Sequence, residues 1–318
     1  MALKDAAERG VSVSALIAYA NHGGEKSLRK LEMRLLEGGV TVSRTADDLV
    51  RYHDKLLIID RSVLYVLSFN FTHLDIDHSR GFGIITRKNK FVQEALKLLA
   101  ADTARIPYAA GLDTFVVSPM NSRKQLLALI ERAKKELLVY DPKIADTEML
   151  RALNERAKKG VDVRVIGAVG RASPHLKVRP LGGFRLHTRT IVCDGREAFV
   201  GSQSLRKAEL DSRREVGLIV RDSHVVSAVV NTFEADWRAK KTTESVHDTR
   251  PVLKKRLKEM VEKLSPLNPL VKEAVDEVVS KKGNKDLNKT EVKETVEKAV
   301  KEAVREKVEE MLSEAVEP

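Results

Sequence analysis

The sequence predicts an α/β protein of two related halves, each a mixed sheet flanked by helices, followed by a helical tail. Three observations predict this fold. A spaced motif occurs twice at a distance of 134 residues, apolar strand-sized segments alternate with helical ones around both copies, and the composition changes after Trp237. We expect a first half over 1–110, a second half over 111–240 and a tail over 241–318. The halves should pack pseudo-symmetrically, so that the two motifs meet at their interface.

The repeat begins with a helix and a strand. ALKDAAERGVSV at 2–13 matches ALNERAKKGVDV at 152–163, and both predict a helix that ends at a glycine before a strand. The first half then has 16 extra residues ahead of its motif. They fall near 26–37, where leucines at helical spacing indicate an amphipathic helix. After the motifs, SRGFGIIT at 79–86 aligns with RREVGLIV at 213–220, which predicts a buried strand in each half.

The second half opens on elements that the first half lacks. DTFVVSP at 113–119 and ELLVYDP at 136–142 predict strands, with a helix over roughly 122–135 between them. Because the first repeat begins only at the counterpart of the following helix, its sheet should have fewer strands. Exposed strand edges pair with other segments unless they are covered. We expect the helix near 26–37 or the tail to cover this edge.

The tail predicts a strong helix over 289–316. Asn288 and Glu291 have the spacing of a capping box, and an apolar stripe follows on one face. The stripe consists of Val292, Val296, Ala299, Ala303, Val304, Val308, Met311 and Ala315. Docking on the body, self-association as a coiled coil and contact with a membrane surface stay open for this helix.

The composition is that of a globular protein, with 42% hydrophobic and 32% charged residues and a net charge of +11. The basic excess lies in 1–240, because 241–318 holds equal numbers of acidic and basic residues. A basic body favours anionic partners, either a phospholipid or membrane surface or nucleic acid. The apolar runs are too short to cross a bilayer, the N-terminus shows no signal-peptide core, and the single Cys193 cannot form an internal disulfide. We expect a cytoplasmic protein, with a peripheral position at the membrane as the open alternative.

The two motifs carry the residue types that phosphodiester chemistry needs. His53 and Lys55 stand in YHDKLLIID, and His187 and Arg189 stand in LHTRTIVCD. In a strand, residues i and i+2 point to the same side, so each histidine shares a face with its cation. A neutral imidazole can attack phosphorus, while a second, protonated imidazole supplies a proton to the leaving oxygen. Cations neutralise the charge that builds on the phosphoryl oxygens.

This constellation resembles the phospholipase D superfamily, in which an HxKxxxxD motif occurs twice and each copy is followed by a GSxN segment. The first copy matches at His53, Lys55, Asp60, Ser68 and Asn70. The second copy matches at His187, Asp194, Gly201 and Ser202, with Arg189 in place of the lysine and Ser204 in place of the asparagine. The resemblance implies two phospholipase D-like halves. It further implies a phosphohistidine intermediate on one histidine, with the other acting as general acid and base.

The resemblance also assigns roles to single residues. The catalytic set it implies is His53, Lys55, His187, Arg189 and Glu215, with Ser68, Asn70, Ser202 and Ser204 binding substrate and with Asp60 and Asp194 structural. In that family a downstream carboxylate orients the opposite histidine, so Glu215 makes His53 the expected nucleophile. The aligned position in the first half is Gly81, and Asp75 or Asp77 is the candidate partner of His187. No metal or cofactor is expected, because the two-histidine mechanism needs none and the sequence has no Cys/His cluster with metal-ligand spacing.

The nearest branch by resemblance is that of the cardiolipin synthases and phospholipases D. It predicts a phosphodiesterase or phosphatidyltransferase that acts on phospholipids. A nuclease of the same superfamily is the first alternative: the basic body favours it, whereas an aromatic content of 4% leaves few stacking platforms for single strands. The second alternative is a degenerate member that binds anionic lipid or nucleic acid without catalysis, which Arg189, Gly81 and the shortened first half favour.

Overall fold

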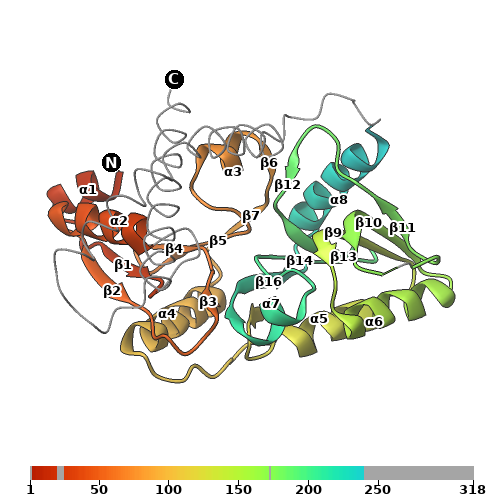
Figure 1. Ribbon diagram of the computed structural model, residues 1–318, viewed down its shortest axis with the longest axis horizontal. Helices are drawn as coiled ribbons and strands as arrows, with labels where there is room; N and C mark the ends of the chain where they lie inside the picture. The colour runs from red at the N-terminus through yellow and green to blue at the C-terminus, as the bar shows by residue number, and fades with distance from the viewer. Residues whose placement is uncertain (1, 20–24, 172, 240–318) are drawn as a thin grey trace, which may run out of the picture. The chain divides into compact units, whose positions relative to one another are not determined.

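A computed structural model describes residues 2–19, 25–171 and 173–239 (Figure 1). The helix predicted over 289–316, with its capping box and its proposed self-association, lies outside the described residues. The described chain forms an α/β structure with a mixed sheet flanked by helices, in agreement with the predicted class. None of its helices combines the length and the apolarity that a membrane crossing requires.

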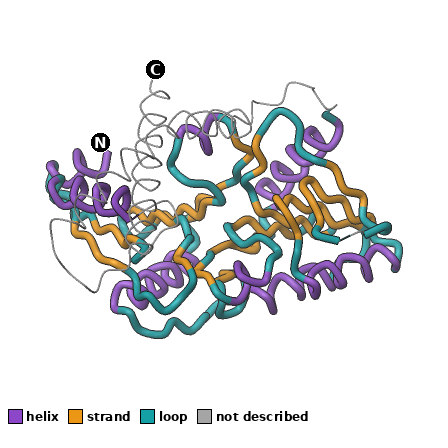
Figure 2. The backbone as a smooth tube through the Cα atoms, in the orientation of Figure 1, coloured by secondary structure: helices purple, strands orange, loops and turns teal. Residues whose placement is uncertain are grey.

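The second half is built on a seven-stranded mixed sheet with the order β11-β10-β9-β13-β14-β16-β8. Strands β9, β10 and β11 are parallel, and the others run antiparallel to their neighbours. Helices cover both faces of this sheet (Figure 2), with α5 and α6 packing on one face and α8 on the other. The elements are β8 (Phe115–Val117), α5 (Ser122–Glu131), β9 (Glu136–Ile144), α6 (Thr147–Lys158), β10 (Asp162–Val169), β11 (Lys177–Arg179), β13 (Arg189–Cys193), β14 (Glu197–Gly201), α7 (Lys207–Asp211), β16 (Val216–Val220) and α8 (Ser223–Arg238).

The first half has fewer strands, as predicted. Among the described residues it forms an antiparallel sheet β4-β5-β7 and a separate parallel pair β1-β2. The reason lies in β9, which joins β10 to β13 in the second half and has no described counterpart in the first. The predicted helix near 26–37 is α2, and it packs on β2. The elements are α1 (Ala2–Glu8), β1 (Ser14–Ile17), α2 (Glu25–Glu37), β2 (Thr41–Arg44), β4 (Leu56–Ile59), β5 (Val63–Leu67), α3 (His73–Asp77), β7 (Gly83–Thr86) and α4 (Asn89–Ala104).

Two short strand pairs cross between the halves. β3 (Arg51–Tyr52) pairs with β15 (Arg213–Arg214), and β12 (Arg185–Leu186) pairs with β6 (Ser79–Arg80). Under the repeat of 134, positions 51 and 79 of the first half correspond to positions 185 and 213 of the second. The two strand pairs are therefore the same contact, formed once in each direction between the halves. Each pairing continues into a motif, because the backbone amide of His53 donates to the Arg214 carbonyl at 2.8 Å and that of His187 donates to the Arg80 carbonyl at 3.1 Å.

Two bidentate ion pairs reinforce this junction. Arg214 contacts Asp102 on α4 with nitrogen–oxygen distances of 3.0 and 2.8 Å, and Arg80 contacts Asp236 on α8 at 2.8 Å twice. The two pairs are again equivalent under the repeat. Paired guanidinium–carboxylate hydrogen bonds fix both distance and orientation. They fix β6 and β15 in place, and with them the Arg80 and Arg214 carbonyls that accept from the amides of His187 and His53.

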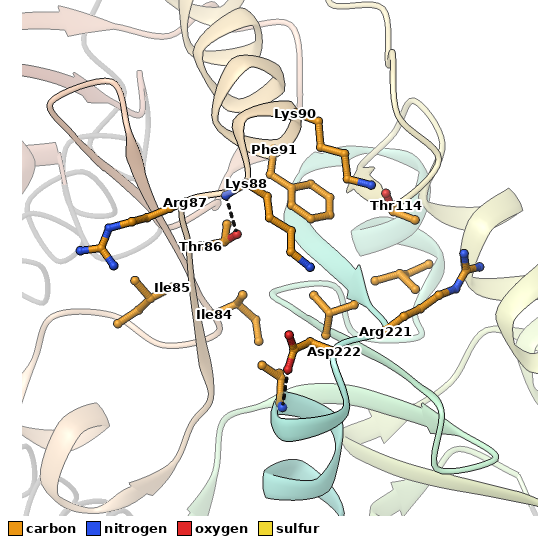
Figure 3. A pocket seen from close by; sticks show the side chains of 13 residues that line it. Ile84, Ile85, Thr86, Arg87, Lys88, Lys90, Phe91, Thr114, Arg221 and Asp222 are labelled. Atoms are coloured by element: carbon orange, nitrogen blue, oxygen red, sulfur yellow. Dashed lines mark hydrogen bonds between the residues drawn. The ribbon is translucent and has the colours of Figure 1, made fainter.

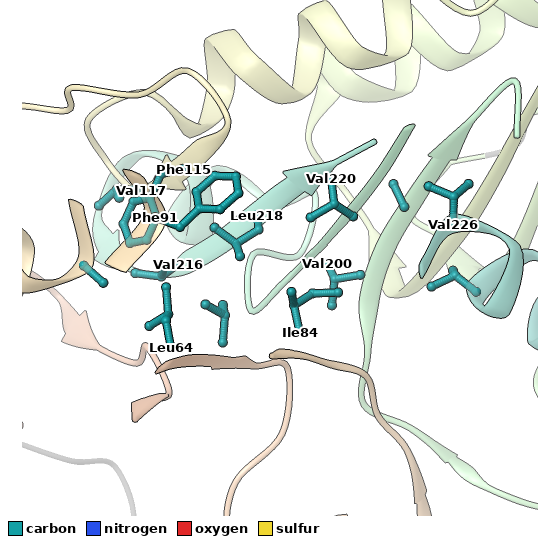
Figure 4. Close-up of a cluster of buried hydrophobic side chains, with 14 of the residues drawn as sticks. Leu64, Ile84, Phe91, Phe115, Val117, Val200, Val216, Leu218, Val220 and Val226 are labelled. Atoms are coloured by element: carbon teal, nitrogen blue, oxygen red, sulfur yellow. The ribbon is translucent and has the colours of Figure 1, made fainter. Parts of the chain in front are cut away.

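An apolar core runs through the junction. Leu64 and Ile84 of the first half lie in one cluster with Val200, Val216 and Leu218 of the second (Figure 4). Burial of this shared apolar surface stabilises the contact between the halves, which have one common core here. Because the core is continuous, the spacing of the two motifs across it is fixed by packing.

Candidate active site

His53 lies between β3 and β4, with a carboxylate on one side of its ring and an ammonium group on the other. Its Nδ1 lies 3.0 and 2.9 Å from the two carboxyl oxygens of Glu215, whose side chain is fully buried. When Glu215 is ionised it accepts from Nδ1–H, so the lone pair remains on Nε2. Lys55 Nζ lies 2.8 Å from that Nε2. The ring is therefore oriented with its nucleophilic nitrogen beside a cation.

His187 has the equivalent position but not the equivalent partner. Its Nδ1 is buried and makes no hydrogen bond within the described part of the chain. The position of Glu215 corresponds to Gly81, where an added Cβ would lie 2.6 Å from Cδ1 of Phe69. The Phe69 ring thus lies where a side chain at this position would begin. The two histidines are consequently unequal.

The candidate partners of His187 separate clearly. The Oδ2 atom of Asp75 lies 3.9 Å from His187 Nε2, whereas Asp77 contacts the exposed His73 at 3.3 Å. Asp75 accepts from the backbone amide of Asn70 at 2.9 Å. The equivalent carboxylate in the other half is Glu209, which accepts from the amide of Ser204 at 2.8 Å. Asp75 therefore belongs to a loop support present in both halves, and it approaches the nitrogen of His187 that faces the site.

The motif cations lie in matching places. Lys55 Nζ donates to the carbonyl of His53 at 2.6 Å, and Arg189 Nη1 donates to the carbonyl of His187 at 2.6 Å. These contacts fix each cation beside its own histidine. The expected single strand through each histidine and its cation is not formed, because 53–55 link β3 to β4 and 187–188 link β12 to β13.

Two further cations were missed in the sequence. Arg51 precedes His53 by two residues, and Arg185 precedes His187 by two. Arg185 pairs with Asp75 and donates from Nε to Ser79 at 3.0 Å. Burial, followed by repulsion from Arg213, lowers the pKa of Arg51. The signal was available, because an arginine two residues before the histidine recurs at the same offset of 134 and on the same strand face.

Burial and crowded positive charge set the protonation of the site. Burial, then the charges of Lys55, Arg51 and Arg189, lowers the pKa of His53 to about 2. Burial and Arg189 lower that of His187 to about 4. Both imidazoles are neutral at pH 7. Burial also lowers the pKa of Lys55 to about 8 and raises that of Glu215 to about 7. An anion between the histidines would relieve the repulsion and raise the histidine pKa values.

The serines and the asparagine lie in places other than those expected. Ser68 and Ser202 are fully buried, and their hydroxyls accept from the amides of Phe82 at 3.0 Å and Val216 at 3.1 Å. Ser202 also hydrogen-bonds Glu215. The side chain of Asn70 donates to Asp75 at 2.6 Å and the hydroxyl of Ser204 donates to Asp141 at 2.6 Å. These four residues support the loops and Glu215, and a role in binding substrate stays a prediction for them.

The motif aspartates lie away from the histidines. Asp194 accepts from three successive backbone amides, those of Lys134, Lys135 and Glu136, at 2.7 to 3.1 Å. It therefore fixes the turn ahead of β9. Asp60 is exposed at the end of β4 with φ 51°. The described first half has no counterpart of 134–136, so Asp60 caps no such turn.

The assembled site can bind and transfer a phosphate-containing group. It offers an oriented neutral imidazole, a second imidazole and cations from both halves. In the described residues, no group of three or more His, Cys, Asp or Glu side chains is arranged to hold a metal ion. The chemistry that these residues support is nucleophilic attack on phosphorus with proton transfer to the leaving oxygen.

Comparisons with known proteins agree with this geometry. Residues 1–103 match the family model described as "Cardiolipin synthase, PLD-like domain". A polyphosphate kinase of Prosthecochloris aestuarii is 26% identical over 204 residues, which cover 58% of this chain and 28% of that protein. The chain thus spans less than a third of that relative.

Two solved structures share the fold. A polyphosphate kinase from Porphyromonas gingivalis superimposes with a TM-score of 0.62 at 18% identity, over 82% of this chain and 48% of that one. The phosphatidylserine synthase of Haemophilus influenzae gives 0.51 at 11% identity, over 83% of this chain and 91% of that one. At these identities the likeness concerns the fold.

Proposed function

The chain carries a phospholipase D-like domain of the phospholipase D superfamily, and we propose from this premise that it transfers a phosphodiester-linked group through a phosphohistidine on His53. The observation that supports this proposal most strongly is the contact of His53 Nδ1 with the two Glu215 carboxyl oxygens, at 3.0 and 2.9 Å. Cations from both halves surround this pair. Of the two motif histidines in the described structure, His53 has its Nδ1 hydrogen-bonded to a carboxylate and His187 does not. The catalytic roles that follow are part of the same proposal.

In the first step, His53 Nε2 attacks phosphorus, a P–N bond forms and the P–O bond to the leaving group breaks. His187, protonated once the anionic substrate is bound, gives its proton to the leaving oxygen. Lys55 and Arg189 balance the charge on the phosphoryl oxygens. Glu215 accepts from Nδ1–H and stabilises the positive charge on the phosphorylated ring.

In the second step, water or an alcohol attacks the phosphohistidine and His187 takes the proton of the acceptor. The P–N bond breaks and neutral His53 is regenerated. Microscopic reversibility assigns the same imidazole to both proton transfers. The acceptor decides between hydrolysis and transfer.

A phospholipid is the first candidate substrate, because an apolar surface adjoins the site. Phe71, Leu74 and Ile76 on and beside α3 are 66%, 51% and 59% exposed, and Phe184 is 44% exposed. The Asp75–Arg185 pair joins α3 to the strand that follows Phe184. Large exposed apolar patches commonly mark lipid or protein contacts. The cardiolipin synthase-type family model and the phosphatidylserine synthase fold support the same candidate.

Polyphosphate is the second candidate. Arg51, Lys55, Arg185 and Arg189 supply more positive charge than a single phosphodiester carries, although Asp75, Glu209 and Glu215 offset part of it. The likeness to polyphosphate kinases in sequence and fold supports this candidate. A chain of phosphates would place negative charge beside all four of these cations.

A side-by-side assay separates the candidates. The full chain and a His53→Ala variant are incubated with phosphatidylglycerol vesicles, with polyphosphate plus a nucleoside diphosphate, and with DNA. We expect His53-dependent turnover of the vesicle lipid. If only polyphosphate or only DNA is turned over, that compound, and not phospholipid, is the substrate. If no substrate gives turnover that depends on His53, the proposed transfer is wrong and a binding role remains.

A further inference from the structure

A cavity separate from the catalytic centre lies at the far ends of the strands that lead away from it. β7 and β16 start next to Gly81 and Glu215, and their last residues line a cavity of about 480 Å³. Five residues of extended chain separate Glu215 from Val220, which corresponds to about 16 Å. The cavity is therefore distinct from the phosphate site.

Both halves contribute equivalent positions to this cavity. Thr86, Arg87 and Lys88 of the first half correspond under the repeat to Val220, Arg221 and Asp222 of the second, and all six line it. The cavity thus lies at the junction of the halves. Its volume falls in the range of small-molecule sites.

The lining combines an apolar floor with a cationic rim. Ile84, Phe91 and Ile219 are 6%, 5% and 3% exposed and form the floor. Figure 3 shows the ammonium groups of Lys88 and Lys90 turned into the space, whereas the guanidinium groups of Arg87 and Arg221 point away from it. Arg221 instead pairs with Glu197 at 3.1 Å.

The two lysines lack counter-charges in the described structure. No carboxylate described here lies within ion-pair distance of Lys88 or Lys90, and the one acid of the lining, Asp222, is engaged elsewhere. Its carboxylate accepts from the amides of His224 at 3.1 Å and Val225 at 3.3 Å and so caps α8. At the equivalent start of α4, Lys88 makes no capping bond. The carboxylate of Asp222 at the start of α8 thus corresponds to the ammonium group of Lys88 at the start of α4, and both residues line the cavity.

We infer that this cavity binds an organic anion, with its charged group at Lys88 and Lys90 and an apolar body on the floor of Ile84, Phe91 and Ile219. An apolar floor alone would favour a neutral ligand, and lysines alone would favour an inorganic ion. Their combination in one cavity selects a molecule that has both parts. Because the lining comes from both halves, such a ligand contacts both.

The test uses the full chain and 1-anilinonaphthalene-8-sulfonate, an aromatic anion whose fluorescence rises in apolar surroundings. A double variant, Lys88→Glu with Lys90→Glu, should weaken binding by at least about tenfold. Lys124→Glu with Lys135→Glu is the matched control, since it makes the same charge change at exposed positions outside the cavity. This control should bind as the unaltered chain does.

A cavity-filling variant tests the apolar half of the site. Thr114→Trp leaves both lysines in place and should also abolish the binding. Thermal unfolding of each variant checks that it is folded. The inference is overturned if the dye binds equally well to both cavity variants, which would assign the signal to another surface such as α3. It is overturned as well if the charge control loses the same affinity, or if dimethyl phosphate displaces the dye.

Discussion

The two histidines differ in what holds them, and this difference has a kinetic consequence. His53 is oriented by Glu215, whereas the Nδ1 of His187 is buried without a hydrogen bond in the described structure. Because His187 is the proposed acid of the first step, His187→Ala should slow the P–O cleavage of a dialkyl phosphodiester by about 10²- to 10⁴-fold. It should cost less than about tenfold with bis(p-nitrophenyl) phosphate, whose leaving group is a stable anion.

The leaving group released in the first turnover, before the second step limits the rate, measures this effect with both substrates. His53→Ala is the control, because loss of the nucleophile should abolish both reactions. Equal losses in His187→Ala for the two leaving groups would contradict the assignment of His187 as the acid.

Arg189 stands where the family pattern has lysine. Its Nη1 makes the same 2.6 Å contact to the motif carbonyl that Lys55 Nζ makes in the other half. Arg189→Lys should therefore keep or raise kcat/KM. A loss greater than about tenfold, which corresponds to about 1.4 kcal/mol of barrier, would show instead that the guanidinium makes a contact with phosphate that an ammonium cannot.

The charge of Lys55 should limit anion binding on the alkaline side. Its pKa is lowered to about 8 by burial, so the ammonium form that attracts phosphate is lost as the pH rises through that value. The affinity for dimethyl phosphate, whose own charge is constant, should fall as the pH rises through about 8, in addition to any change at lower pH that comes from Glu215 and His187. In Lys55→Arg the alkaline part of this fall should vanish, because a guanidinium stays protonated. Calorimetric titrations at several pH values would contradict this explanation if both proteins lost affinity alike.

At the scale of elements, the crossing strands depend on their ion pairs with α4 and α8. Arg214 and Asp102 are 5% and 4% exposed, so Asp102→Asn would leave a buried guanidinium without its counter-charge. We expect a loss of about 3 kcal/mol in the free energy of unfolding. Activity should fall too, because Arg214 precedes Glu215 and its carbonyl accepts from His53.

Denaturant unfolding measures the loss, and an exposed pair provides the comparison. Glu155→Gln removes the partner of Lys158 in a pair whose side chains are 48% and 52% exposed, and should cost much less. If Asp102→Asn cost no more than this comparison variant, the Arg214–Asp102 pair would not support the junction.

The internal repeat explains how much of these elements the sequence could predict. A repeat of 134 residues with matching strands determined the α/β class, the smaller strand count of the first half and the meeting of the motifs. The spacing also predicted Lys55 and Arg189 near their histidines, although the structure holds them there by contacts in the links between strands. These features follow from local spacing, which a sequence displays directly.

Other features depend on contacts that spacing does not display. The Arg80–Asp236 pair joins residues far apart in the chain, and nothing local marks either as a partner. Phe69 fills the space at Gly81 only because the strands bring them together. The expected substrate contacts of Ser68 and Ser202 came from motif positions alone, and the structure turns both hydroxyls towards backbone amides.

At the scale of the whole molecule, the described body holds every residue that the proposed chemistry uses. The crossing strands, both ion pairs and all motif residues lie between 51 and 236. A chain that ends at Ala239 should therefore fold cooperatively and keep its activity on a small diester within about twofold. Loss of cooperative unfolding in this shortened chain would mean that 240–318 complete the core.

The central claim is that His53 carries the transferred group. The most direct measurement is mass-spectrometric mapping of the adduct after the His187→Ala variant is mixed with bis(p-nitrophenyl) phosphate and quenched under alkaline conditions that preserve phosphohistidine. The account predicts a p-nitrophenyl phosphoryl group on His53, and no adduct in His53→Ala. An adduct on another residue, or p-nitrophenolate release that continues in His53→Ala, would contradict it.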